Sequence, residues 1–65
     1  MQEHVKRMII EKDDLDGKIK RCRKALAAPP FGIDKEGLYL LSKQCEAMES
    51  YSHWLNERLK KEGVN

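Results

Sequence analysis

A dense group of basic side chains is the feature of this sequence with the most direct chemical use. The segment from Lys18 to Lys24 carries five basic residues in seven positions, among them Lys20 and Arg21. An arginine guanidinium offers a rigid fork of donors to phosphate oxygens, and a lysine ammonium is a mobile point charge. The segment is therefore a candidate site for a ligand that carries phosphate groups.

The same basic segment also has a simpler explanation in helix electrostatics. Basic side chains stabilise the C-terminal end of a helix, where the backbone dipole leaves partial negative charge. Asp14 and Asp16 precede Lys18 and Lys20 by one helical turn, which is the spacing of ion pairs within a helix. The sequence alone leaves both explanations open.

A second group of side chains forms a stripe at helical spacing in the C-terminal half, and it includes both an arginine and two aromatic residues. Aromatic and arginine side chains are typical of subunit interfaces, and Ala47 is small enough for close approach. We expect Leu40, Ala47, Tyr51 and Trp54 to form an oligomer interface. The alternative is that Tyr51 and Trp54 only cover the ends of the molecule. The whole stripe consists of Leu40, Gln44, Ala47, Tyr51, Trp54 and Arg58.

Catalytic and metal-binding patterns are weak. His4 and His53 stand alone, with no Cys or Ser at a catalytic spacing, and the glycines are too scattered for a phosphate-binding loop. The acidic run is better explained as a solvated surface than as a metal site. We therefore predict a protein that is not an enzyme and has no cofactor and no metal. The acidic run comprises Glu11, Asp13, Asp14 and Asp16.

Two amphipathic helices are predicted to position these side chains. Apolar residues alternate at steps of three and four in both halves of the chain, which is the heptad pattern of a helix packed on one face. Each half has one polar residue in this seam, Lys12 in the first and Ser52 in the second. The first seam is Val5, Met8, Lys12, Leu15, Ile19, Cys22 and Leu26. The second is Leu38, Leu41, Cys45, Met48, Ser52, Leu55 and Leu59.

The helix ends have recognisable signals. Pro29 and Pro30 should stop the first helix, Asp34 can cap the start of the second, and Gly63 suits its C-terminal cap. We predict an all-α, antiparallel two-helix hairpin in one domain, with helices over about residues 3–27 and 34–62 and a loop over about 28–33. Folding back at Phe31 should place residues 20–24 beside 38–42, and Tyr51 and Trp54 beside residues 8–11.

A single hairpin of 65 residues cannot enclose a core of its own, so we expect a homo-oligomer. No signal peptide or membrane-spanning stretch is evident, which predicts a cytoplasmic protein with no membrane partner. In that reducing compartment Cys22 and Cys45 should act as small buried apolar residues, although they could form one disulfide. The net charge of +2 and the lack of a DNA-binding helix pattern argue against duplex nucleic acid.

The segment Lys43-Gln44-Cys45-Glu46-Ala47-Met48-Glu49-Ser50-Tyr51, followed by Leu55-Asn56-Glu57-Arg58-Leu59, resembles small helical-hairpin proteins of tailed phages. The match also takes in the helix from Glu11 to Ile19, and so covers most of the chain. In size and architecture these hairpins resemble the viral anti-CBASS sponges, oligomeric proteins that sequester the cyclic nucleotides of bacterial immune signalling.

The resemblance implies a phage protein that traps a cyclic dinucleotide such as cGAMP, or a cyclic trinucleotide, without degrading it in the infected host's cytoplasm. It implies that Arg21 with Lys24 and Arg58 contact phosphates while an aromatic residue stacks on a base. The resemblance also implies a homo-oligomer, for which a hexamer is one candidate. The ligand-binding residues that we predict are Lys20, Arg21, Lys24, Phe31, Tyr39, Tyr51 and Arg58.

One departure from the sponge pattern concerns the stacking residue. In the sponges the basic position is usually followed by Leu and, three residues further on, by an aromatic residue, whereas here Cys22 follows Arg21 and Ala25 replaces the aromatic. Phe31 or Tyr39 could substitute for it. The alternative function is an oligomeric hairpin adaptor that binds a host or phage protein through the stripe, and a third hypothesis is a nonspecific nucleic-acid binder.

Overall fold

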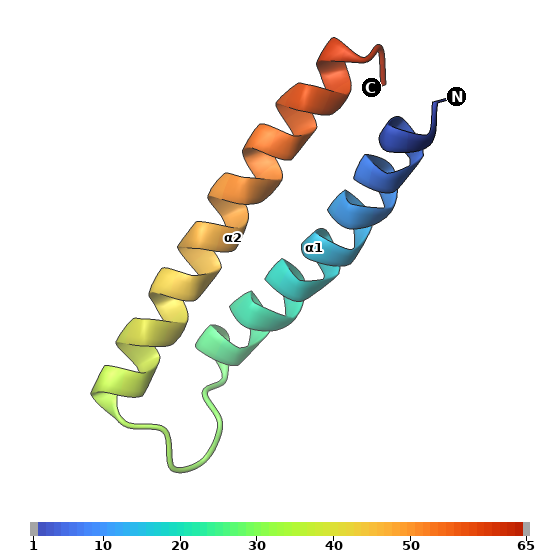
Figure 1. Ribbon diagram of the computed structural model, residues 1–65. Coiled ribbons are helices and arrows are strands. Elements are labelled where there is room, and N and C mark those ends of the chain that lie inside the picture. The colour runs from blue at the N-terminus through green and yellow to red at the C-terminus, as the bar shows by residue number, and fades with distance from the viewer. Residues whose placement is uncertain (1, 65) are drawn as a thin grey trace.

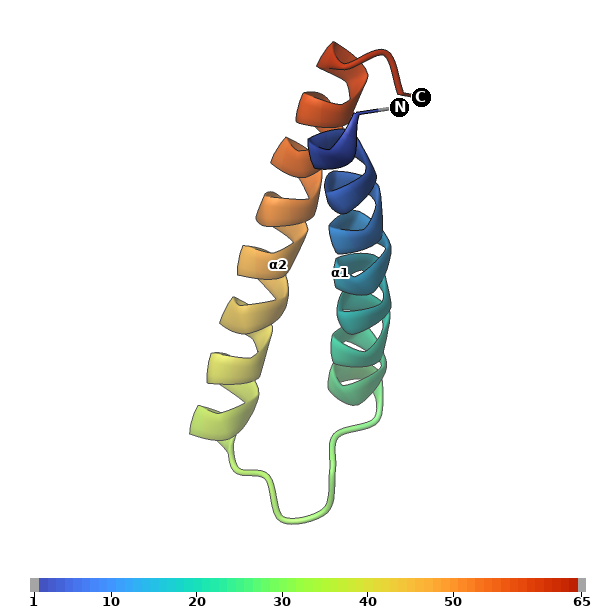
Figure 2. The same ribbon diagram turned by 45° about the vertical axis from the view of Figure 1, so that its right-hand side comes forward.

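The computed structural model describes residues 2–64 as two long helices joined by one loop (Figure 1). Helix α1 spans Glu3–Ala27 and helix α2 spans Lys35–Lys61. The two helices lie side by side and antiparallel in both views, with the chain ends together at one end of the rod (Figures 1 and 2). The prediction of an all-α antiparallel hairpin is confirmed.

The core is the contact between the two heptad seams. At the end that holds both termini, Val5 and Met8 of α1 are buried against Leu55 and Leu59 of α2, and Val64 packs on this cluster. The buried residues continue along the hairpin through further seam positions, namely Leu15, Cys22 and Cys45. The chain measures only 46 × 15 × 15 Å, so the core is a single layer of side chains between two helices.

The two polar seam positions face each other across the hairpin. The Lys12 ammonium donates to the Ser52 hydroxyl at 3.3 Å and to the Asp16 carboxylate at 2.8 Å, and Ser52 donates to Asp16 at 2.7 Å. These hydrogen bonds lower the pKa of Asp16 from its usual value, with the Lys12 bond as the largest cause. A polar pair of this kind within an apolar seam favours one register over the alternatives.

Both predicted caps of α2 are confirmed. The Asp34 carboxylate accepts a hydrogen bond from the Gly37 amide at 2.8 Å, and a Cβ at Gly37 would lie only 2.8 Å from the Ile33 side chain. Gly37 therefore lets Ile33 pack over the start of the helix. At the other end Gly63 has a positive φ of 86°, and the Val64 amide donates to the Leu59 carbonyl at 2.9 Å. This is the Schellman arrangement that glycine permits.

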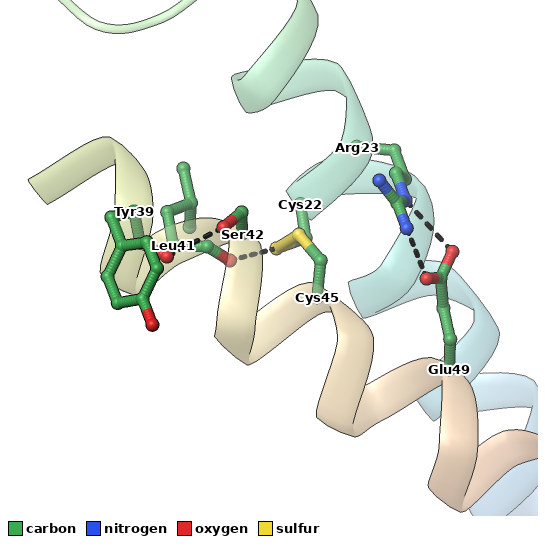
Figure 3. Close-up of a disulfide and its surroundings, with 7 residues drawn as sticks. All are labelled: Cys22, Arg23, Tyr39, Leu41, Ser42, Cys45 and Glu49. Carbon is green, nitrogen blue, oxygen red and sulfur yellow. Dashed lines mark hydrogen bonds and ion pairs between the residues drawn. A yellow bond between two sulfur atoms is a disulfide. The ribbon is translucent and has the colours of Figure 1, made fainter. Parts of the chain in front are cut away.

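The expectation that the two cysteines are separate apolar side chains is wrong, because Cys22 and Cys45 form a disulfide between the helices (Figure 3). Both residues are buried, as the seam pattern predicted. Their Cα atoms are 5.9 Å apart, a separation that suits a disulfide. The reason for the error is that facing seam positions bring the two thiols into bonding range.

The disulfide also fixes how the helices are staggered. Cys22 lies opposite Cys45, about one turn further along α2 than a simple fold back at Phe31 predicted. In Figure 2 the loop first continues beyond the end of α1 and then returns to α2, which starts further out. The basic segment of α1 consequently lies closer to Tyr51 than the sequence suggested.

Candidate functional site

An open groove runs along one flank of the hairpin, where α1 and α2 meet. Its volume is about 550 Å³, which is within the range of small-molecule sites. Most of its wall comes from α1, and α2 contributes an aromatic ring. The lining residues are Arg7, Ile10, Glu11, Asp14, Leu15, Lys18 and Tyr51.

A second hollow of about 290 Å³ adjoins this groove and extends it toward the disulfide. Lys18 lines both hollows, so the two form one continuous surface. We call this surface the flank groove and define it by the residues of both hollows. The second hollow adds Arg21, Cys22, Leu41, Gln44 and Met48.

Helical periodicity explains why α1 places charged groups on one flank. Arg7, Glu11, Asp14, Lys18 and Arg21 follow one another at steps of three and four, so they lie on one side of the helix. Their row runs beside the buried seam rather than within it. Of these residues, the sequence prediction of ligand-binding positions included only Arg21. The other four could have been identified from the sequence, because charged residues recur there at steps of three and four.

Tyr51 reaches across the flank groove from α2 to α1. Its hydroxyl donates a hydrogen bond to the Glu11 carboxylate, which confirms the predicted proximity of Tyr51 to this part of α1. This hydrogen bond is the main cause that raises the pKa of the Tyr51 phenol above its usual value. The positive charge of Arg58, seven residues further along α2, opposes the rise.

The cations of the groove are left unpaired within the described part of the chain. Within residues 2–64, Lys18 and Arg21 form no ion pair or hydrogen bond through their side chains. Asp16 bonds to Lys12 rather than to Lys20. The ion pair between Asp16 and Lys20 that would have explained the basic segment as a helix-stabilising feature is therefore not formed. Lys18 and Arg21 remain available to an anion.

The opposite flank has a different character, because its charges are paired between the helices. Arg23 of α1 forms a bidentate ion pair with Glu49 of α2 beside the disulfide (Figure 3). The pair lowers the pKa of Glu49 and raises that of Arg23. The His4–Glu62 contact, at 3.1 Å, is separate from this flank, because His4 lies one turn before Arg7 on the groove side of α1. Arg23 thus belongs to the framework that holds the hairpin together.

Five of the seven predicted ligand-binding residues, Arg58 among them, do not line the flank groove. Lys20 and Lys24 are exposed on the rest of the α1 surface, and Phe31 is fully exposed in the loop. Tyr39 points away from the disulfide (Figure 3). Its ring centroid lies 5.5 Å from the Lys43 ammonium. The structure therefore brings Arg21 and Tyr51 together in the flank groove, but not the other five.

The residues predicted for the oligomer interface are all exposed in the single chain. Trp54 is 64% exposed, Leu40 is 58% exposed and Tyr51 is 46% exposed, and Ala47 is exposed between them. The Trp54 ring packs edge-on against His53, with centroids 4.6 Å apart. A large apolar surface of this kind is available for contact with another molecule.

Across residues 2–64 no three His, Cys, Asp or Glu side chains are grouped closely enough to hold a metal ion. The acidic run is divided instead, with Glu11 and Asp14 in the flank groove and Asp16 in the polar layer on the other side. Neither helix in this part of the chain is long and apolar enough to cross a membrane.

Comparison with known proteins gives one family. The model of the Sequestin family matches residues 2–61, which include both helices and the loop between them. No curated protein and no solved structure matches the chain.

Proposed function

The chain belongs to the Sequestin family, and on that premise we propose that it is a sponge, a protein that binds a small signal molecule without changing it chemically. We propose that the signal is a cyclic dinucleotide such as cGAMP, with a cyclic trinucleotide as the larger alternative. The protein would then be a phage product that removes the messenger of a CBASS-type defence in the cytoplasm of the infected bacterium.

The observation that carries this proposal is the meeting of free cations with an aromatic ring in one groove. Lys18 and Arg21 are free of partners within residues 2–64 and lie on the same surface as Tyr51. A cyclic dinucleotide combines two phosphate charges with flat bases. Cations that neutralise phosphate and an aromatic side chain that stacks on a base are the groups that such a ligand requires.

A sponge needs no catalytic groups, and the groove is consistent with a purely binding role. Its ionisable side chains are two carboxylates, a phenol, a lysine and two arginines, and neither histidine lines it. We propose that the ligand is released unchanged. The family name supports sequestration in the same sense.

We further propose that the binding unit is a homo-oligomer, for which a hexamer is one candidate. The flank groove is open, and a single hairpin covers a ligand from one side only. The exposed aromatic stripe adjoins the groove through Tyr51, which belongs to both. Symmetric packing of copies along this stripe would repeat each cation and each ring around the ligand.

Thermal unfolding with a panel of cyclic di- and trinucleotides tests the sponge. A ligand that binds only the folded protein raises the melting temperature, and by several degrees at a large excess over its dissociation constant. The ligand is then released by heating and examined by chromatography. Recovery of the intact nucleotide supports a sponge, and a cleaved product would contradict it.

Matched charge-reversal variants locate the site. Lys18→Glu with Arg21→Glu reverses two charges inside the groove, whereas Lys20→Glu with Lys24→Glu reverses two on the same helix outside it. We expect only the first pair to abolish the ligand-induced stabilisation. Equal losses in both double variants would mean that binding depends on overall charge rather than on this groove.

The second candidate function is an adaptor that binds another protein, and the exposure of Trp54 favours it. The same variants separate the two functions. An adaptor that uses the aromatic stripe would keep its partner in the Lys18→Glu, Arg21→Glu protein and would show no melting shift with any nucleotide of the panel.

A further inference from the structure

The flank groove carries two carboxylates in addition to its cations and its aromatic ring. Glu11 and Asp14 line it between Arg7 and Lys18. We propose that these two carboxylates recognise the hydrogen-bond donors of a guanine base, so that the groove selects a cyclic nucleotide that contains guanine. This inference rests on the proposed function and assigns the base specificity of the same site.

Carboxylates would be unfavourable in a groove that had only to attract phosphate. Two negative charges beside a doubly charged anion reduce the attraction that the cations provide. The arrangement becomes favourable when the carboxylates meet donor groups of the ligand while the cations meet its phosphates. The order along α1 suits this division, because the two carboxylates are adjacent, with Lys18 and Arg21 beyond them on one side and Arg7 on the other.

Glu11 is held in place by Tyr51, the residue whose ring would stack on the base. The Tyr51 hydroxyl donates to one oxygen of Glu11, which leaves the other oxygen of that carboxylate for a further donor. A base stacked on Tyr51 would therefore lie beside an acceptor that is already oriented. Asp14 lies on the next turn of α1 and forms no ion pair or hydrogen bond through its side chain within residues 2–64. Its lone pairs are free.

The choice of guanine follows from the donor pattern of the bases. The Watson–Crick edge of guanine presents two neighbouring donors, the N1–H and the N2 amino group. An ionised carboxylate only accepts hydrogen bonds, so it can receive both. Adenine presents its N6 amino group beside the N1 acceptor, and this acceptor would face a carboxylate oxygen without a proton between them. A mismatch of this kind makes a hydrogen-bonding site selective.

Affinities for cyclic di-GMP and cyclic di-AMP test the inference, because the two ligands have the same backbone and charge. Isothermal titration with the full chain should give an affinity for cyclic di-GMP at least about tenfold higher, as expected for one good bidentate base contact. Asp14→Asn replaces one acceptor by a donor and matches the adenine pattern. We expect this variant, and Glu11→Gln, to reduce the preference to about threefold or less.

Asp13→Asn is the control, since Asp13 is adjacent in sequence but lines a hollow on the other flank. It should leave the ratio of affinities unchanged. A wild-type protein that binds both ligands equally or prefers cyclic di-AMP would overturn the guanine inference and leave the sponge intact. So would an unchanged ratio in both groove variants. If neither ligand nor any other cyclic nucleotide binds the folded protein, the proposed function itself is wrong.

Discussion

At the scale of single residues, the molecule uses its few polar contacts between helices to fix positions. Lys12 and Ser52 occupy the polar positions of the two seams and bond to each other and to Asp16. On the other flank Tyr51 bonds to Glu11. The two contacts lie at nearly the same height on opposite sides of the apolar seam. They therefore limit both sliding and rotation of one helix against the other.

The Tyr51 contact gives a prediction about pH. Because the hydrogen bond to Glu11 raises the pKa of Tyr51 in the folded chain, this contact stabilises the fold on the neutral side of the ordinary phenol value of about 10. The contribution is lost as the pH rises through the raised pKa. We expect Glu11→Gln to lower the Tyr51 pKa, because a neutral amide no longer favours the protonated phenol.

This titration is read from the ultraviolet absorbance of the phenolate. Tyr39 is first replaced by Phe in all proteins, so that Tyr51 is the only tyrosine left. Asp13→Asn serves as the control, since it removes a nearby carboxylate that does not contact the ring. An identical Tyr51 titration in the Glu11→Gln protein would show that the hydrogen bond does not form in solution.

At the scale of the elements, two straight amphipathic helices are joined by one short loop and one covalent bond. The disulfide lies between the loop and the middle of the hairpin, next to the Arg23–Glu49 ion pair (Figure 3). Near the termini, by contrast, the helices are held by the cluster of Val5, Met8 and α2 side chains. The disulfide thus secures the part of the hairpin where the basic side of the flank groove lies.

Removal of the disulfide should be costly for so small a core. Because the bonded cysteines are separated by 23 positions in the sequence, loop-closure entropy gives a loss of about 3 kcal/mol in the free energy of unfolding. Urea unfolding followed by circular dichroism, at one protein concentration, measures this for the oxidised protein with and without reductant. A Cys22→Ala, Cys45→Ala variant is the control and should not respond to reductant. An unchanged midpoint of the wild type under reductant would contradict the prediction.

Much of the fold could be predicted from sequence because the heptad pattern is a local, repeating signal. Val5, Met8, Leu55 and Leu59 are buried where the pattern placed them, and Asp34 caps α2 as predicted. The disulfide and the stagger were missed because both depend on how far the loop extends. No local pattern reports that distance. The pairing of two seam cysteines on facing helices was nonetheless a usable hint.

The site could be predicted only in part. Arg21 and Tyr51 were named from their types and from a family resemblance, and both line the flank groove. Lys20 and Lys24 were included because the basic segment was treated as one unit, whereas a helix distributes neighbouring residues around its axis. The carboxylates Glu11 and Asp14 were set aside as solvated charges. Their place in the groove becomes visible only when the opposite wall is known.

At the scale of the whole molecule, the main property is a shortage of burial. A rod of 46 × 15 × 15 Å has a core only one layer deep, and its aromatic stripe is open to solvent. Small domains of this kind usually gain stability from association. Both the proposed sponge and the alternative adaptor use the stripe, so the state of assembly is the measurement that links structure to function.

Trp54 is the residue on which assembly should depend most, because a tryptophan buried at an interface often contributes a large part of the binding energy. Light scattering of the wild type should give a multiple of the 7.6 kDa chain mass, and Trp54→Ala should move the mass toward a single chain. Tyr39→Ala is the matched control, since Tyr39 is similarly exposed at 59% but lies outside the stripe. A wild type that stays monomeric at high concentration would remove the oligomer from the proposal. An oligomer that tolerates Trp54→Ala would instead move the interface to another face of the hairpin.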